Sequence, residues 1–315
     1  MTELYFTETS ETRVNYLEIT VLGVGVRESG FWSKAGSEAK VCVYSCLDAG
    51  TLRLMPVRCV RLVWSEELEV GVDSGEFLGR LKREVIGHHA LTHPFLERFG
   101  DGEVSPEGVS TFAIQYYRHV RVSRLYLAAV ISNSRDDEGL QLALADILFD
   151  EYGHLNPDET HPALYRRFLR ALGIEQEEWE APRTLPEIAA YISTHYELCR
   201  HPDVRFGLGA LGPASEWPVP PIYVRLAEGL KKAAGLPDAA LEIFTSHVTM
   251  DVEHARIMME AVAPYAEDDE GQWRVREGAM RSLDARSIML DGLYRAVFDE
   301  PAPLHGRTAR TVRVE

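Results

Sequence analysis

Cysteine is scarce in this chain of 315 residues, which has only four. Cys42, Cys46, Cys59 and Cys199 are too few and too unevenly spaced for the disulfide framework of a small secreted protein. Cys42 and Cys46 would supply half of a zinc site, but no second cysteine or histidine pair follows at finger-like spacing. We therefore expect reduced thiols.

Long apolar runs are also absent. No stretch reaches the roughly 18 apolar residues that a membrane-spanning helix needs. Residues 1–10 lack the basic flank and apolar core of a secretory signal. We expect a cytoplasmic protein that makes no use of a membrane.

Positive charge is the third deficit. Lys and Arg number 33 against 49 Asp and Glu, which gives a formal net charge of -16 at pH 7. Binding to nucleic acid or to an anionic membrane needs concentrated basic residues, so both are excluded as main functions. A chain of this length can bury a sizeable core, and we expect it to act on a small molecule.

The first 72 residues have the texture of strands and turns. Segments 14–22, 40–44 and 58–64 are rich in β-branched and aromatic residues, and glycines separate them. The pair Gly23 and Gly25 lacks the third glycine and the following helix of a dinucleotide-binding fingerprint. Residues 1–72 are therefore predicted to form a β-rich extension whose role the sequence does not reveal.

Apolar residues recur at helical spacing from Phe77 onward. Caps, glycines and prolines predict helices at 78–99 (interrupted near Pro94), 105–133, 138–153, 160–172, 185–199, 221–234, 239–265 and 275–298. Segments 207–212 and 213–221 hold enough Gly and Pro to predict loops or broken helix ends. The fold class is mainly α, a bundle of about seven helices at 73–300 with a flexible tail at 301–315.

One predicted helix carries a set of residues suited to metal binding. His247, Asp251 and His254 are spaced four and three apart, so they share one helix face. Imidazoles combined with a carboxylate favour iron or manganese with open coordination positions. The alternative for this stretch alone is a polar stripe on the surface of an amphipathic helix.

Further acidic and histidine residues in the chain are candidates to complete a metal site together with this helix face. Glu151 ends an apolar helix, and His161 opens the next one after a break containing Gly153 and Pro157. A buried glutamate is costly unless it is paired or binds a metal. Glu216 stands alone among apolar and aromatic residues. The alternatives are a capping network around the break and an ordinary surface loop at Glu216.

Taken together, these six residues resemble the haem-oxygenase-like non-haem diiron oxidases. The shared pattern is a Glu and a His across a Gly/Asn-Pro break, an isolated Glu, and then H-x3-D-x2-H near the end of the bundle. The resemblance covers roughly residues 78–298 and includes flanking text at 93–96, 112–117 and 161–165. It implies a haem-oxygenase-like helical bundle that holds two iron ions and uses O2 as co-substrate.

The resemblance also implies roles for these residues and a range of reactions. Glu216 would bridge the two irons, and the metal ligands would be Glu151, His161, Glu216, His247, Asp251 and His254. Relatives that oxygenate nitrogen often have a seventh, acidic ligand, but residues 109–133 contain no Asp or Glu. The implied reactions are C–C cleavage, desaturation or N-oxygenation of an amino-acid-derived or carboxylate-bearing metabolite, in specialised-metabolite biosynthesis.

Other residues are candidates for substrate binding and for support of the ligands. Arg121 and Arg124 share a helix face and are suited to clamp a carboxylate. Tyr116 and Trp217 are candidates to line a pocket, and His119 and His154 to support the metal ligands from behind. The alternatives are solvated arginines, core aromatics and surface histidines. Bundles of this kind often form homodimers, and an external electron donor is compatible with the chemistry.

Two rival functions follow from the same residues. The fold also hosts cofactorless oxidases and hydrolases, and the hydrolases need a nucleophilic cysteine. Cys199 is the only cysteine in the helical part, with His195 and His201 as its nearest bases in sequence. The second rival is a non-enzymatic metal- or partner-binding bundle, which would bind metal without consuming O2.

Overall fold

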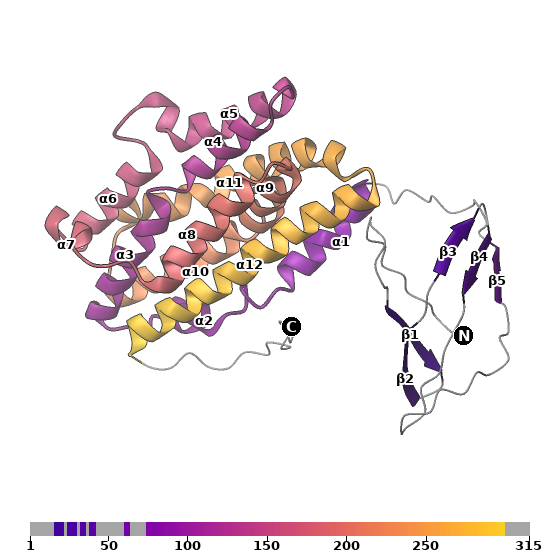
Figure 1. Cartoon of the computed structure of the whole chain (residues 1–315). Helices are drawn as coiled ribbons and strands as arrows, with labels where there is room; N and C mark the ends of the chain where they lie inside the picture. Colours follow the sequence, from indigo (N-terminus) through magenta and orange to yellow (C-terminus); the bar gives the residue numbers. More distant parts are fainter. Residues whose placement is uncertain are drawn as a thin grey trace. The chain divides into compact units, whose positions relative to one another are not determined.

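The computed structural model describes residues 74–299 and, before them, the backbone of five short strands (Figure 1). The chain divides into two units, residues 1–70 and 71–315. Strand β1 (Tyr16–Val21) pairs with β2 (Val24–Ser29), and β3 (Trp32–Ala35), β4 (Glu38–Val41) and β5 (Val60–Val63) form an antiparallel sheet in that order. The rest of residues 1–72 and the tail at 301–315 lie outside the described residues, so a β-rich extension and a flexible tail stay predictions.

The helical unit accounts for all the remaining described residues and is mainly α. Its α-helices are α1 (Ser74–Ile86), α2 (Pro94–Gly100), α3 (Pro106–Val120), α4 (Arg124–Asn133), α5 (Glu138–Glu151), α6 (His161–Ala171), α7 (Gln176–Glu180), α8 (Pro186–Cys199), α9 (Val204–Leu211), α10 (Val219–Ala234), α11 (Glu242–Val262) and α12 (Asp269–Phe298). Within residues 74–299, no helix is long and apolar enough to cross a membrane.

The longest helix, α12, organises the bundle (Figure 1, yellow). It packs chiefly against α9 and α8, with α3 and α1 beside it. Two apolar cores form along it. One core joins α2, α3, α6, α8 and α10 to the C-terminal half of α12. The other joins α1, α4, α5 and α9 to the N-terminal half of α12.

The boundary between these two cores is where polar residues are buried. The first turns of α11 contribute Ile243 and Phe244 to one core, and its last turns contribute Met258 and Val262 to the other. The candidate ligands His247, Asp251 and His254 lie between these two ends, and they are 8%, 2% and 2% exposed. The fold therefore places the candidate metal ligands in a polar layer between two apolar cores.

Residues 74–299 form twelve α-helices, where about seven were predicted. Two of the differences have a clear physical reason. Residues 207–212 were predicted as a loop or broken helix end, but all of them except Gly212 belong to α9. Its glycines serve close packing: a Cβ at Gly209 would lie 1.9 Å from the Val275 carbonyl oxygen of α12, and one at Gly278 of α12 would lie 2.1 Å from the Phe206 carbonyl oxygen. Glycine there allows two helix backbones to touch and does not end a helix.

The second difference is a break at residues 121–123, which separates α3 from α4 where one helix to residue 133 was predicted. Two backbone hydrogen bonds form at this break: the Arg121 N–H donates to the Tyr117 carbonyl, and the Ser123 N–H donates to the His119 carbonyl. The hydroxyl of Ser123 also donates to the Val120 carbonyl, 3.1 Å away. No Gly or Pro marks the break, so the pattern of apolar residues did not reveal it.

Candidate metal centre

The six residues predicted as metal ligands lie together in two groups of three. The first group is Glu151, His161 and His247, and the second is Glu216, Asp251 and His254; within each group the ligand atoms lie within 4.8 Å of one another. Helix α11 contributes to both groups. The remaining three residues come from the end of α5, the start of α6 and the turn before α10.

A left-handed reversal brings Glu151 and His161 together. After α5 ends at Glu151, the turn η1 (Gly153–Leu155) has φ values of 58° at Gly153, 53° at His154 and 66° at Leu155. Thr160 then caps α6 by accepting a hydrogen bond from Ala163 N–H. As a result, Nδ1 of His161 lies 2.8 Å from Oε2 of Glu151. Positive φ is costly for residues other than glycine and concentrates at functional sites.

A single π-helical turn positions Glu216. The turn η2 (Gly212–Glu216) follows α9 directly, and the hydroxyl of Ser215 donates to the Ala210 carbonyl at 3.0 Å. It leaves Oε2 of Glu216 3.9 Å from Nδ1 of His254, which is itself 3.8 Å from Oδ1 of Asp251. Such π turns are rare and occur frequently at functional sites.

Hydrogen bonds orient two of the three histidines. His247 donates from Nδ1 to the Ile243 carbonyl at 2.6 Å, which leaves Nε2 as the lone-pair nitrogen. His254 donates from Nε2 to Oδ2 of Asp150 at 3.1 Å, which leaves Nδ1 toward Glu216 and Asp251. Metal-binding histidines characteristically have the second ring nitrogen held in this way. Asp150 was missed in the sequence, although it directly precedes Glu151.

The charges of the site call for a cation. Burial raises the pKa of Glu216 well above its usual range, and the nearby Asp251 and Glu151 carboxylates raise it further. Burial and Glu151 together raise the pKa of Asp251 to about 8. Burial also opposes ionisation of Glu151, but the imidazoles of His161 and His247 outweigh it and bring the pKa of Glu151 to about 2.

One buried atom of the site lacks a partner among the described residues. Oδ2 of Asp251 is inaccessible to solvent and accepts no hydrogen bond. Carboxylates that crowd together and leave a lone pair unused inside a protein are destabilising unless a cation binds them. The mixture of carboxylate and imidazole donors suits iron or manganese, so the residues present fit the metal that the sequence predicts.

A small cavity of about 90 Å³ adjoins both groups of ligands. Its lining includes five of the six candidate ligands, together with His119, Tyr126, Tyr191, His195 and Arg286. His119, predicted to support the ligands, is therefore part of the cavity wall. Burial lowers the pKa of His119 well below its usual value and that of His195 to about 4, so both rings are neutral near pH 7.

The four residues predicted to bind substrate lie outside this lining, as does His154. Tyr116 is buried in an aromatic core cluster, and Trp217 is half-buried with the Lys82 ammonium 5.6 Å above its ring. Arg121 is exposed at the end of α3, and Arg124 stacks on Tyr152. His154 is exposed and pairs with Asp150 at 2.9 Å. The roles proposed for these residues stay predictions.

Arg286 is a charged residue of the cavity wall that was not predicted from the sequence. It is 2% exposed and lies on α12 among Ala285, Ser287 and Met289, which are also buried. A charged residue inside an otherwise apolar and small-residue helix face was the available signal. It was masked by the other arginines of α12, which form ion pairs at the surface.

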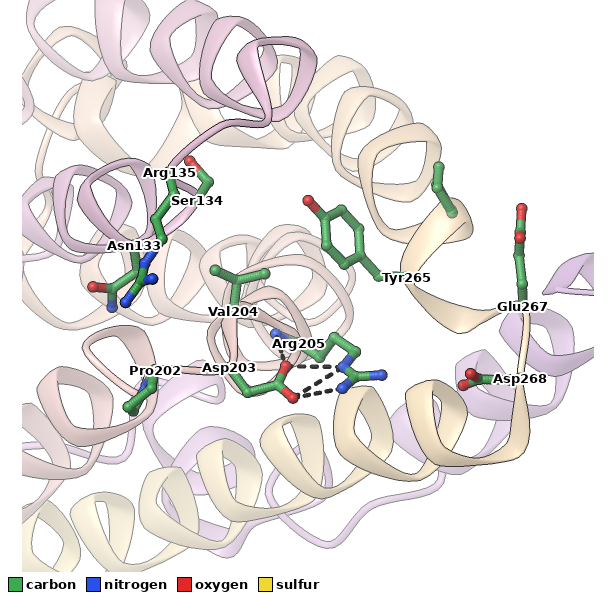
Figure 2. Close-up of a pocket in the computed structure, with 11 residues that line it drawn as sticks. Asn133, Ser134, Arg135, Pro202, Asp203, Val204, Arg205, Tyr265, Glu267 and Asp268 are labelled. Atoms are coloured by element: carbon green, nitrogen blue, oxygen red, sulfur yellow. Dashed lines mark hydrogen bonds and ion pairs between the residues drawn. The ribbon is translucent and has the colours of Figure 1, made fainter.

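A larger hollow lies elsewhere in the bundle. It has a volume of about 650 Å³ and is lined by residues from the end of α4, the start of α9 and the connection between α11 and α12. Figure 2 shows its wall, where Asp203 forms a bidentate ion pair with Arg205. It contains neither an imidazole nor a candidate metal ligand, so the smaller cavity is the candidate active site.

Two further sets of residues are weaker candidates for a functional site. His88, His89 and Asp284 form a third set of closely spaced ligand atoms, but Asp284 is exposed and the Nδ1 atom of His88 accepts the Ala90 N–H. Cys199 is buried, and burial raises the pKa of its thiol to about 12. A thiol so far from ionisation does not serve as the nucleophile of a hydrolase.

A helical bundle with carboxylate and histidine ligands on facing elements defines a class of metal-binding helical proteins. Within that class, residues 110–287 match the model of a family described as iron-containing redox enzymes. The chain therefore belongs to the iron-containing redox enzyme family. This result confirms the family that the sequence indicated.

Sequence relatives support the same assignment. The chain is similar to the 4-aminobenzoate synthase of Nitrosomonas europaea, with 31% identity over 67% of this chain and 87% of the relative. It is also similar to the 4-chloro-allylglycine synthase of Streptantibioticus cattleyicolor, with 22% identity over 70% of this chain and 84% of the relative. Both relatives are named as enzymes.

Solved structures confirm the haem-oxygenase-like fold of the helical unit. A CADD-like protein of unknown function from Nostoc punctiforme superposes with a TM-score of 0.62 at 16% identity, covering 72% of this chain and all of that one. A domain with a heme oxygenase-like fold from Shewanella denitrificans gives a TM-score of 0.54 at 17% identity, covering 70% and 90%.

Proposed function

We propose that this chain is a non-haem diiron oxidoreductase that uses O2 to oxidise a small carboxylate-bearing metabolite. The observation that carries the proposal is the presence of two adjacent groups of three ligands, linked by α11. The first group would hold one iron through Glu151, His161 and His247. The second would hold the other through Glu216, Asp251 and His254.

Each residue of the proposed site would have a distinct role. Two ferrous ions bound here would supply the electrons for the reduction of O2. Glu216 is close enough to Asp251 and Glu151 for their charges to raise its pKa, so its carboxylate would be stabilised in the ionised form by the bound ions and would help to hold them. Asp150 and the Ile243 carbonyl hold the rings of His254 and His247 in place. The apolar cores on both sides exclude bulk water.

The names of the relatives support the proposed substrate class. Aminobenzoate carries a carboxylate on an aromatic ring, and chloro-allylglycine is an unsaturated amino acid. We therefore keep an amino-acid-derived or carboxylate-bearing substrate, in specialised-metabolite biosynthesis, with C–C cleavage, desaturation or N-oxygenation as the outcome. A cytoplasmic location, an external electron donor and a homodimer also remain part of the proposal.

Anaerobic titration with ferrous iron tests the metal centre. Wild type is expected to bind two irons per chain. His161→Ala and His254→Ala each remove one histidine from a different group, so each is expected to bind one iron. The double variant is expected to bind none. Glu253→Ala, which alters an exposed acid next to His254 on α11, is the matched control and should keep both irons.

Mixing the iron-loaded protein with O2 then tests the enzyme. Rapid O2 consumption by wild type and slow consumption by both single variants would support the diiron oxidase. Iron uptake that is equal in all variants would overturn the metal site. Normal uptake of two irons with no O2 consumption, alone or with a panel of small carboxylates, would favour a metal-binding bundle without enzymatic activity.

A further inference from the structure

We infer that Arg286 is the anchor for the carboxylate of the substrate, in the cavity beside the two groups of metal ligands. This inference rests on the proposed function and names the part of the site that would select an acidic substrate. It moves the carboxylate-binding role from Arg121 and Arg124, which lie outside the cavity lining, to a buried arginine of α12.

The guanidinium of Arg286 is buried with most of its hydrogen-bonding capacity unused. Nη2 donates to the Ala214 carbonyl at a long 3.3 Å, and Nε has no partner among the described residues. No carboxylate within residues 74–299 lies within ion-pair distance of it. A buried arginine without a counter-ion is costly, and such groups are retained where a ligand supplies the missing charge.

Comparison with Arg118 shows what a structural arginine in this bundle is like. Arg118 is 5% exposed, and its Nε, like that of Arg286, has no partner among the described residues. The difference is at Nη2, which in Arg118 donates to two carbonyl oxygens, at 2.7 Å to Pro182 and 3.3 Å to Glu180. It holds the loop that follows α7 and does not line the cavity. Arg286 makes one long contact of this kind, with the Ala214 carbonyl of η2, and its side chain also lines the cavity.

The groups packed around Arg286 are neutral. The ring of Tyr191 lies 5.6 Å from the guanidinium carbon. His195 donates from Nδ1 to the Tyr191 carbonyl, and its Nε2 accepts from the Ser282 hydroxyl, which fixes an uncharged ring. A second donor is also unused: the hydroxyl of Tyr126, on the same cavity wall, is buried without a partner among the described residues.

The net charge of the loaded site favours an anion. Two ferrous ions and the three carboxylates of Glu151, Glu216 and Asp251 leave one positive charge, which the Asp150 carboxylate beside His254 offsets. Arg286 then adds a positive charge without a paired carboxylate among the described residues. An uncompensated charge in an apolar interior is strongly unfavourable. A single carboxylate that receives two parallel hydrogen bonds from Arg286 would reduce it, and arginine is the side chain best suited to this geometry.

The cavity volume limits the size of the ligand. About 90 Å³ is smaller than the roughly 150 Å³ of an engineered cavity that binds benzene. The site as it stands therefore accommodates a compact carboxylic acid, and a longer substrate requires the side chains of the wall to move. We expect propionate to bind, and propionamide, which has the same shape without the charge, to bind far more weakly.

Calorimetric titration with propionate and propionamide tests the anchor, on iron-loaded protein without O2 and on metal-free protein. Arg286→Met keeps the length of the side chain and removes the charge, and we expect a 10- to 100-fold higher Kd for propionate. Tyr126→Phe keeps its volume and should raise the Kd roughly 5-fold. Arg281→Met is the matched control, since Arg281 lies on the same helix and pairs with Glu197, and it should leave the Kd unchanged.

Each outcome decides between the two proposals. Equal propionate affinity in wild type and Arg286→Met, or equal affinity for the amide, overturns the anchor even if two irons bind. A loss produced by Arg121→Met or Arg124→Met instead also overturns it. If wild type takes up no iron but the Arg286 effect appears in metal-free protein, the anchor stands and the diiron function fails. Should Arg286→Met not fold, Arg286→Lys serves, because lysine lacks the bidentate geometry and must still weaken propionate binding.

Discussion

At the scale of single residues, the site depends on which nitrogen of each histidine is left with its lone pair. Histidine is a metal ligand only through an unprotonated nitrogen, and the hydrogen bond at the other nitrogen selects it. For His247 the partner is the Ile243 carbonyl of its own helix, and for His254 it is Asp150 of α5. One selection is therefore local and the other depends on the packing of two helices.

Because the hydrogen bond to His254 joins two helices, we predict that substitution of Asp150 alters metal binding. Asp150→Asn keeps the shape but weakens the hold on His254, so we expect iron in the second group to bind about 10- to 100-fold more weakly. Iron in the first group should bind as in wild type. Anaerobic titration would show a second binding step shifted to higher iron concentration.

The control for this experiment is Asp146→Asn. Asp146 lies one turn earlier on α5 and is exposed, so its substitution should change neither step. If Asp150→Asn left both binding steps unchanged, Asp150 would have no part in holding the metal ligand.

The sequence predicted single residues well where their chemistry was local. Spacing and residue type made the six residues candidates, the family resemblance implied that they form one metal site, and the structure brings them together. Asp150 and Arg286 were missed because their roles depend on what lies opposite them after folding. Asp150 reads as a surface acid next to Glu151, and Arg286 as one more arginine of a helix rich in them.

At the scale of elements, the turn that reverses the chain between α5 and α6 has an unusual backbone conformation. Three successive residues with positive φ turn the chain back within a few positions, and Gly153 has no room for a side chain. A Cβ at Gly153 would lie 2.5 Å from the Glu159 carbonyl carbon. The pairing of Glu151 with His161 therefore depends on a glycine that binds nothing itself.

A matched pair of glycine substitutions tests this element. Gly173→Ala introduces a Cβ at φ 75° with nothing within 4 Å, so we expect a loss of about 1 kcal/mol in the free energy of unfolding. Gly153→Ala adds the clash with Glu159 to the same backbone strain, so the expected loss is ~2–5 kcal/mol. Chemical denaturation of both variants measures the difference.

Iron binding separates stability from site geometry in this pair. Gly153→Ala should also lose iron at Glu151 and His161, whereas Gly173→Ala should bind two irons. Equal losses of stability in the two variants, with normal iron uptake by both, would contradict the importance of the tight reversal.

The elements also show where sequence patterns stop being informative. Helices with a clear apolar period and a proline in the first turn, such as α8 and α10, were placed to within one or two residues. Helix α9 was missed because Gly207 and Gly209, which break helices in isolation, are here required by contact with α4, α8 and α12. The break after α3 was missed because no residue in it has a strong preference against helix.

At the scale of the whole molecule, every residue assigned to the metal centre and the cavity lies in the unit from residue 71 onward. Both apolar cores are also built within residues 74–299. The helical unit should therefore fold and bind iron without the first 70 residues, whatever the role of those residues is.

Truncation tests this expectation. A chain that starts at Gly71 is expected to unfold cooperatively and to bind two irons per chain with the affinity of the full protein. Circular dichroism melting and anaerobic iron titration of both chains measure it. An insoluble product, or a truncated chain with fewer irons, would show that the first unit takes part in folding or in the metal centre.

Asp150 and His254, which share a hydrogen bond, lie far apart in the sequence, and this separation sets an order of events during synthesis. These residues are 104 positions apart. At roughly 5–20 residues per second, Glu151 and His161 leave the ribosome some 5–20 s before the last ligands of α11. Until α11 follows, the nascent chain offers at most two of the candidate carboxylates, Glu151 and Glu216, and one imidazole, too few to hold two irons firmly. Iron capture is thereby postponed until the bundle can enclose it, and a chain interrupted before α11 releases no half-built iron site into the cell.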